Sequence, residues 1–183
     1  MTRKAYAALL RGINVGGNKK LPMAELRALL TDLGHDDVRT YLQSGNALFT
    51  SDQDDEEALA GQLRQAIGTH FGFDVDVLVR DHHYLKAVAE ACPFPAASLQ
   101  GKQLHVTYFS EPVQESRLAS LDVAAFLPEE FRLGDRALYL YAPDGLGRSP
   151  LAEALARSGP PKGVIATSRN WNTVLKLVEL TQP

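Results

Sequence analysis

The order of predicted strands and helices places the chain in the α+β class. The first half reads as β-α-β-β-α-β, the second half repeats β-α-β-β-α less regularly, and a proline-bracketed stretch at residues 93–101 separates them. The first order is the ferredoxin-like one, a split βαβ unit with both helices on one face of an antiparallel sheet. We therefore predict two ferredoxin-like-related subdomains with antiparallel sheets, residues 1–92 and 102–183, joined by a 93–101 linker and completed by a C-terminal helix.

Hydrophobic spacing marks the first strand and the first helix. Lys4–Leu10 is a short apolar run, as expected of a buried strand. Pro22 fits the first position of a helix, and Gly34 supplies its C-terminal stop. Between them, the leucines recur at the i, i+3, i+4, i+7 spacing of one helical face: Leu26, Leu29, Leu30 and Leu33.

A hairpin and a second helix are predicted next. Val38–Leu42 and Ala47–Thr50 read as strands that the turn residues Gln43–Asn46 connect. Ser51 or Asp52 is the expected cap of the helix that follows. The first turn of that helix is acidic, which the helix dipole favours.

The next elements cross into the second half. Alternating apolar and polar residues over 73–80 predict a half-exposed strand, after which Asp81 caps a helix that Pro93 ends. Leu104–Tyr108 alternates as a strand, and Pro112 is expected to open a short helix.

The remaining elements complete the second half. A hairpin is predicted over 131–141 and a helix behind Ser149 and Pro150, where a capping residue precedes a proline at the first helical position. A weak strand at Gly163–Thr167 and a closing helix over about Asn170–Leu180 finish the chain.

Composition excludes several classes of function. With 183 residues, of which 45% are hydrophobic and 22% charged, the chain has the profile of a globular protein. A net charge of −3 counts against sequence-independent nucleic-acid binding, which needs many cations on phosphates. One cysteine and five histidines without metal-ligand spacing predict no disulfide and no metal site. The absence of a secretory signal pattern and of a long apolar run predicts a cytoplasmic location and no membrane partner.

The stretch Arg11–Lys20 concentrates glycines, asparagines and cations where the first strand meets the first helix. It is not a P-loop, because Asn18 stands at the lysine position, and Asn14 breaks the dinucleotide-binding glycine pattern. Backbone N–H groups that converge on an anion, helped by the cations, remain one interpretation. The alternative is that the glycines only permit positive φ in a long connection and the lysines are solvated. The candidate ligand-binding residues here are Arg11, Gly12, Asn14, Gly16, Gly17, Asn18 and Lys19.

Two further stretches are more polar than their elements require. The turn after the second strand offers a hydroxyl and two amides, although a tight turn alone also explains it. The start of the last helix offers an arginine, whose planar fork suits phosphate or carboxylate. The alternative for that segment is that it only caps the helix and buries Trp171. The candidates are Gln43, Ser44, Asn46, Arg169, Asn170 and Asn172.

Topology predicts where two of these stretches lie. In a split βαβ sheet the first and third strands are antiparallel neighbours, so the turn at 43–46 should lie beside the loop at 12–18. We further predict, as a hypothesis, that Arg169 and Asn172 join the same site, since convergent polar groups are the usual mark of a binding site.

Three motifs in order, Leu10–Gly17, Tyr41–Asn46 and Ala166–Thr173, resemble those of DUF1697, a bacterial family of unknown function. The resemblance runs from near residue 4 to near residue 180. Ser168 stands where the family more often has alanine. The resemblance implies two α+β subdomains akin to the ferredoxin-like unit, and it implies no established activity.

These features predict a protein that binds a small anionic ligand, bearing phosphate or carboxylate, at the loop after the first strand. The sequence identifies no catalytic residue, cofactor or oligomeric state, and leaves enzymatic activity open. One alternative is a protein-interaction module without catalysis. Another is an RNA-binding module, since ferredoxin-like sheets also serve as RNA platforms, although the acidic charge and the missing RNP1 pattern count against it.

Overall fold

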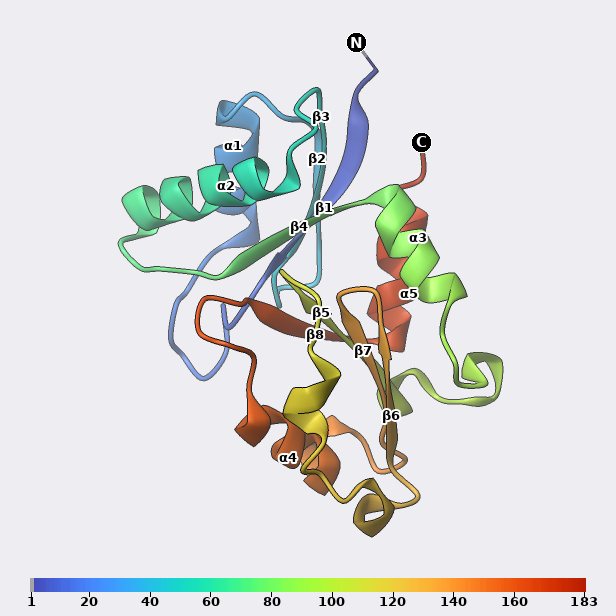
Figure 1. Ribbon diagram of the computed structural model, residues 1–183. Helices are drawn as coiled ribbons and strands as arrows, with labels where there is room; N and C mark the ends of the chain where they lie inside the picture. The colour runs from blue at the N-terminus through green and yellow to red at the C-terminus, as the bar shows by residue number, and fades with distance from the viewer. Residues whose placement is uncertain (1) are drawn as a thin grey trace. The chain divides into compact units, whose positions relative to one another are not determined.

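A computed structural model describes residues 2–183 as an α+β protein with two four-stranded antiparallel sheets and five α-helices (Figure 1). The described chain divides into two compact units. The first extends as far as Lys86 and takes in Leu177–Pro183, and the second is Ala87–Lys176. The predicted α+β class is confirmed, with a separate sheet in each unit.

The first unit places its first and third strands side by side. Its sheet has the order β2-β3-β1-β4 with every pair antiparallel, and Leu9 of β1 lies opposite Asn46 of β3. The elements are β1 (Lys4–Leu10), α1 (Met23–Asp32), β2 (Asp36–Tyr41), β3 (Asn46–Ser51), α2 (Glu56–Phe71) and β4 (Val77–Asp81).

Helices α1 and α2 cover one face of this sheet and enclose its core (Figure 1). The leucine face predicted for α1 is confirmed, because Leu26 and Leu30 are fully buried while Leu29 and Leu33 pack at the edge of the core. Burying each such leucine contributes about 1.5–3 kcal/mol, so these contacts hold α1 on the sheet. Gly34 ends the helix with a φ of +90°, as predicted.

Two details of the first unit differ from the sequence-based expectations. The strand expected to be half-exposed, now β4, is buried on both faces over Val77–Arg80, so alternation was a misleading guide to its exposure. Helix α2 is capped by Asp55, whose carboxylate accepts hydrogen bonds from the N–H groups of Glu57 and Ala58, both at 3.0 Å. The expected cap at Ser51 or Asp52 is wrong, because β3 continues through Ser51.

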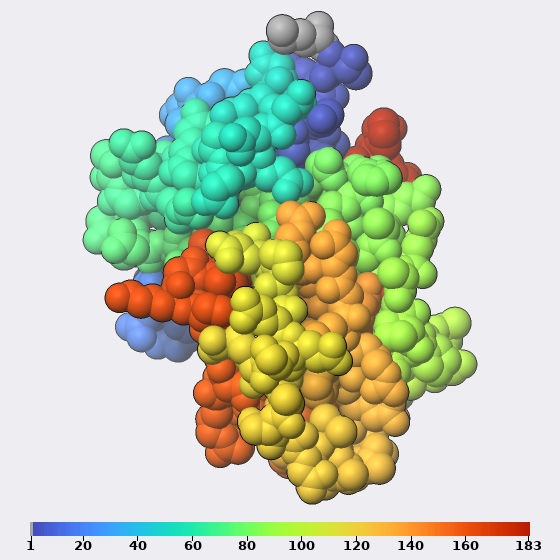
Figure 2. Space-filling view, viewed as in Figure 1, coloured from blue at the N-terminus to red at the C-terminus, as the bar shows by residue number. Residues whose placement is uncertain are grey.

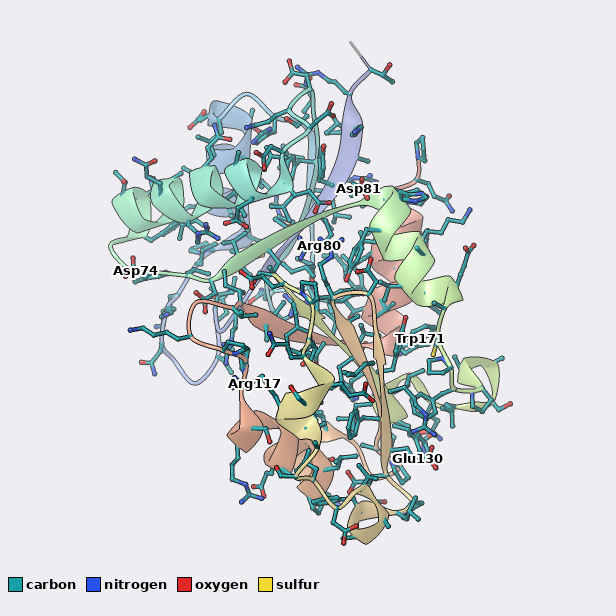
Figure 3. The ribbon with its side chains drawn as sticks, viewed as in Figure 1. Asp74, Arg80, Asp81, Arg117, Glu130 and Trp171 are labelled. Atoms are coloured by element: carbon teal, nitrogen blue, oxygen red, sulfur yellow. The ribbon has the colours of Figure 1, made fainter. Side chains whose placement is uncertain are left out.

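A partly buried ion pair joins the start of α2 to the end of β4. The guanidinium of Arg80 lies 3.2 Å from the carboxylate of Glu56 and 5.2 Å from the centre of the Tyr84 ring. The same carboxylate accepts the N–H of Asp81 at 2.8 Å. Arg80 and Asp81 are labelled at the end of β4 in Figure 3. Asp81 in turn accepts the N–H of Tyr84 at 2.8 Å, which confirms it as the cap of α3 (His82–Glu90).

The C-terminal residues complete the first unit. Helix α5 (Trp171–Leu180) ends there, and Arg39 of β2 donates to the Leu180 carbonyl at 2.7 Å. The imidazole of His82 lies 3.0 Å from the hydroxyl of the buried Thr181. These two contacts hold the end of the chain against the first sheet and α3.

The second unit has a sheet of order β6-β7-β5-β8, again antiparallel throughout. Its elements are β5 (Leu104–Phe109), β6 (Glu130–Gly134), β7 (Ala137–Tyr141), α4 (Pro150–Ser158) and β8 (Ala166–Asn170). Ser149 caps α4 by accepting the N–H of Ala152 at 2.9 Å, as predicted. The last strand begins three residues later than expected, because its partner β5 pairs with Ala166–Asn170.

The short helix expected at Pro112 is absent from the described chain. Between β5 and β6 there are only 3-10 turns, at Glu115–Leu118 and Val123–Phe126. These turns make i→i+3 hydrogen bonds, which poorly support longer helices. Among the helices of residues 2–183, α4 alone therefore packs on the core that Phe109, Leu138, Leu140 and Leu151 form in this unit.

Across residues 2–183, none of the helices is both long enough and apolar enough to cross a membrane.

His105 should make the stability of the protein sensitive to acid. It lies on β5, is nearly fully buried, and its Nδ1 has no hydrogen-bond partner within the described chain. Burial lowers the pKa of His105 below its ordinary value of 6.5. The unfolded chain therefore binds the proton more tightly, and the free energy of unfolding should fall as the pH drops through about 6.5.

We expect His105→Asn to flatten this dependence by up to about 1.4 kcal/mol per pH unit, the limit for one proton. Urea unfolding between about pH 7.5 and pH 5 measures it. His83→Asn, at an exposed position on α3, is the matched control and should keep the original slope. An unchanged slope in His105→Asn would contradict the assignment.

Candidate functional site

The loop between β1 and α1 folds into a small hairpin. The N–H of Asn18 donates to the carbonyl of Val15 at 3.2 Å, and the N–H of Asn14 donates to the carbonyl of Lys19 at 3.1 Å. Gly16 and Gly17 form the tip, with φ values of +61° and +78°. Positive φ at both central residues is what a type I′ turn requires, and two glycines adopt it without steric cost. The paired glycines are therefore explained by the turn itself.

The side chain of Asn14 fixes this hairpin to its surroundings. Its Oδ1 accepts the N–H of Leu21 at 2.9 Å, and its Nδ2 donates to the carbonyl of Leu21 at 2.9 Å. The amide thus pairs with the peptide groups of Leu21 as a strand neighbour would, directly before α1. Nδ2 also donates to the carbonyl of Gln43 at 2.8 Å. Asparagine suits this position because Asn14 has a φ of +54°, which asparagine tolerates better than most residues.

Backbone contacts bring the 43–46 turn against the same loop. The N–H of Leu10 donates to the carbonyl of Gly45 at 2.8 Å. A Cβ on Gly45 would lie 2.8 Å from the Leu10 carbonyl oxygen and 3.2 Å from Cγ1 of Ile13. The predicted proximity of this turn to the loop is therefore found, and it depends on the missing side chain of Gly45.

The cations of the loop differ in their partners. The Nζ of Lys19 donates to the carbonyl of Asp74 at 2.7 Å. Arg11 lies 3.9 Å from the carboxylate of Asp76, and both side chains are more than half exposed, so this ion pair contributes little to stability. Lys20 is exposed next to them. The loop thus presents positive charge, which the neighbouring carboxylates partly offset.

Exposure separates the residues predicted in these two stretches. Asn46 is fully buried, and its amide donates to the carbonyl of Tyr41 at 2.9 Å, which closes the turn. The other candidates are exposed: Arg11, Gly12, Asn14, Gly16, Gly17, Asn18, Lys19, Gln43 and Ser44.

Sequence reasoning missed two exposed apolar side chains on these loops. Val15 is 62% exposed on the hairpin and Leu42 is 53% exposed on the turn. Both lie outside the helices and strands, so no periodic pattern of apolar residues identified them. Both loops therefore present an apolar side chain to solvent.

The third stretch lies in the second unit, on β8 and the start of α5. Arg169 is opposite Val106 of β5 and only 9% exposed. Its Nη1 donates to the hydroxyl of Thr167 at 2.7 Å and to the carbonyl of Ser168 at 2.8 Å. Burial lowers the pKa of Arg169 to about 10, although Tyr108 acts in the opposite direction. The guanidinium therefore stays charged at neutral pH.

The residues after Arg169 begin α5. Asn170 accepts the N–H of Thr173 at 3.0 Å and so caps the helix, while Trp171 is buried, as the structural interpretation predicted. A Cβ on Gly101 would lie 2.4 Å from the side chain of Asn172. The exposed Asn172 therefore packs where Gly101 leaves room, a contact that sequence reasoning missed.

Among residues 2–183, no group of three or more histidine, cysteine or acidic side chains is placed to hold a metal ion. The single cysteine, Cys92, is partly buried, and burial raises the pKa of its thiol.

Comparisons with known proteins agree on the fold but give no activity. The family model described as "Protein of unknown function (DUF1697)" matches residues 3–139. The solved structure of the conserved bacterial protein SP0830 from Streptococcus pneumoniae is similar, with a TM-score of 0.79 and 26% identity over 99% of this chain and 100% of that chain. Among curated proteins, none matches. The family match includes the first two motifs and ends before the third.

Gly45 offers a direct test of the close approach between turn and loop. We expect Gly45→Ala to destabilise the protein by about 2–4 kcal/mol, because a methyl group would clash with Leu10 and strain a φ of +103°. Gly34→Ala is the matched control, since Gly34 also has positive φ but no heavy atom within 4 Å of an added Cβ. The control should lose only about 1 kcal/mol. Equal losses in urea unfolding would show that the contact does not matter.

Proposed function

The chain belongs to the DUF1697 family of proteins of unknown function, and from its geometry we propose that it binds a small anion at the Arg11–Lys20 loop. The observation that carries the proposal is the fixation of this loop by Asn14. Three hydrogen bonds from one side chain hold an exposed hairpin, which is more order than a plain connection between strand and helix needs. Such pre-organisation lowers the entropic cost of binding.

The chemistry of the loop favours an anion that bears phosphate or carboxylate. In the described chain, no backbone hydrogen bond of the loops and turns has the N–H of Gly16 or Gly17 as its donor. Both residues are exposed at the tip of the hairpin. Arg11 and Lys20 add exposed cationic side chains to the same loop. Backbone N–H groups in a turn, combined with nearby cations, form a common anion site. Asp74 and Asp76 reduce the local positive charge, so we expect a dissociation constant on the order of 1 mM for a simple anion.

Several finer features belong to the same proposal. Each unit is proposed to be ferredoxin-like, which the strand order and the antiparallel pairing support, and the subdomain limits at 1–92 and 102–183 remain a prediction. We also retain Gln43 and Ser44 as ligand contacts from the turn, and Arg169, Asn170 and Asn172 as contacts from the second unit. Because Arg169 is buried and Asn170 is a helix cap, replacing either should also lower stability. The proposed location is cytoplasmic.

A protein-interaction module is the second candidate function. Val15 and Leu42 favour it, because both are exposed on the loops that Asn14 joins. An RNA platform has less support, since such platforms stack bases on open aromatic faces and the aromatic side chains of β1 and β3, Tyr6 and Phe49, are buried.

Thermal unfolding in the presence of anions tests the proposal. At about ten times the dissociation constant, a bound anion stabilises the native state by about 1.4 kcal/mol, which raises Tm by roughly 3–6 °C for a chain of this size. We expect phosphate, nucleotides, sugar phosphates or carboxylates to give such a shift at constant ionic strength. The double variant Arg11→Ala/Lys20→Ala should lose it.

Lys102→Ala is the control, because Lys102 lies in a 3-10 turn of the second unit, and it should keep the full shift. If no anion in the screen raises Tm, a protein-interaction module is favoured over an anion-binding protein. If Val15→Ser/Leu42→Ser then abolishes capture of a specific partner protein, that reading replaces the anion proposal.

A further inference from the structure

In the part of the chain that the structure describes, the second sheet lacks one of the helices that the first sheet has. In the first unit, ten-residue α1 connects the first two strands and buries Leu26 and Leu30. In the second unit, the described connection between β5 and β6 contains only 3-10 turns. From this connection Leu118 and Phe126 pack against the core, and neither is fully buried. The layer that covers the second sheet is therefore thinner at this place.

A groove of about 980 Å³ lies between these turns and β6. Leu151 of α4 lines it and is fully buried, so the groove reaches the hydrophobic core. Phe131 and Leu133 of β6 line it, together with Leu118 of the connection between β5 and β6. Figure 2 shows the 115–127 segment, yellow to gold, at the surface of the molecule. The groove is at the upper limit of small-molecule pockets in size and is open to solvent.

Two apolar side chains on the groove are exposed to water. Val123 is 50% exposed and Leu127 is 61% exposed, and both line the groove. Covering such a side chain removes apolar surface from water, which is favourable in proportion to the area covered. An apolar partner that covered both would therefore gain affinity from the hydrophobic effect.

Charge gives the groove a preference. Its lining carries three carboxylates, Glu115, Glu129 and Glu130, against one cation, Arg132. Arg132 lies 3.2 Å from Glu130, which is labelled beside β6 in Figure 3. Glu129 accepts a hydrogen bond from the hydroxyl of Ser149. The apolar groove therefore has a net negative lining, which complements lysine and arginine.

We propose that this groove docks a basic amphipathic helix of a partner protein. The apolar side chains of that helix, at i, i+3 or i+4, and i+7, enter the groove beside the 3-10 turns that connect β5 and β6. Its lysines and arginines face Glu115 and Glu130. This proposal uses other residues than the anion proposal and does not depend on it.

A helix fits better than an added strand. β6 is an edge strand with a partner, β7, on one side. Hydrogen-bonded and non-hydrogen-bonded residue pairs alternate along an antiparallel hairpin, and the hydrogen-bonded pair Gly134–Ala137 closes this one. Phe131 is therefore in a non-hydrogen-bonded pair, and its N–H and carbonyl point to the free edge of the sheet. Arg132 donates to the Phe131 carbonyl at 2.8 Å and so occupies an acceptor that an added strand would need.

A synthetic peptide tests the proposal. The probe is a fluorescent helix of about four turns, with leucines at the stated spacing and lysines flanking them. In fluorescence polarisation with the full chain, we expect a dissociation constant on the order of 10–100 µM. Leu127→Asp should weaken binding at least about tenfold, and Glu115→Lys at least about threefold. Leu146→Asp and Glu111→Lys are the matched controls, since both positions are exposed in the same unit and outside the groove.

Each alternative to the proposed docking site predicts a different experimental result. A peptide with glutamates in place of the lysines should bind at least about tenfold more weakly, and equal binding would overturn the charge argument. Equal effects of Leu127→Asp and Leu146→Asp would overturn the assignment of the groove. Concentration-dependent dimerisation that Leu127→Asp abolishes would show a second copy as the occupant instead, and no binding at about 1 mM peptide would reject the proposal. Circular dichroism of each variant verifies folding.

Discussion

The loops of the first unit depend on the hydrogen bonds of the Asn14 side-chain amide. One side chain accepts and donates to Leu21 and donates to Gln43, so it joins the β1–α1 hairpin, the entry to α1 and the β2–β3 turn. Leu21 is fully buried, and a buried peptide group that loses its hydrogen-bond partner costs about 1–3 kcal/mol, so the amide of Asn14 stabilises this arrangement. Gly45 adds the second constraint, because only glycine allows the β1 backbone to approach this closely. The proposed anion site is a consequence of this fixed frame.

The two units use the same strand order with different coverings. Both sheets place their first strand in the centre, between the third and fourth strands of the unit. In the first unit two helices cover the core, and the described loops carry the unusual polar groups. In the second unit a helix is replaced by 3-10 turns, and exposed apolar side chains result. The two units therefore differ in the surface that each exposes: the loops of the first unit are polar, and the connection in the second unit is apolar.

Local sequence patterns correctly predicted most of the helices and strands, and the strand order predicted one contact between separate loops. Leucine spacing predicted α1, the Ser149-Pro150 pair predicted the start of α4, and strand pairing predicted the contact between loop and turn. Alternation failed for β4, because periodicity reports exposure only when one face of a strand is solvated. Pro112 suggested a helix that the chain does not form, because a proline favours a helix start without supplying an apolar face to bury. The role of Asn14 was not predictable, since its partners are set by tertiary contacts.

Hydrogen exchange of Asn14→Gly measures the central claim most directly. Glycine keeps the positive φ of this position and removes only the side-chain amide. We predict that the N–H of Leu21, which donates to Asn14, and that of Leu10, which donates to Gly45, will both exchange about tenfold faster. Asn18→Gly, in the same hairpin, should leave both rates unchanged. Unchanged protection of Leu21 and Leu10 in Asn14→Gly would contradict the claim that this side chain holds loop and turn together.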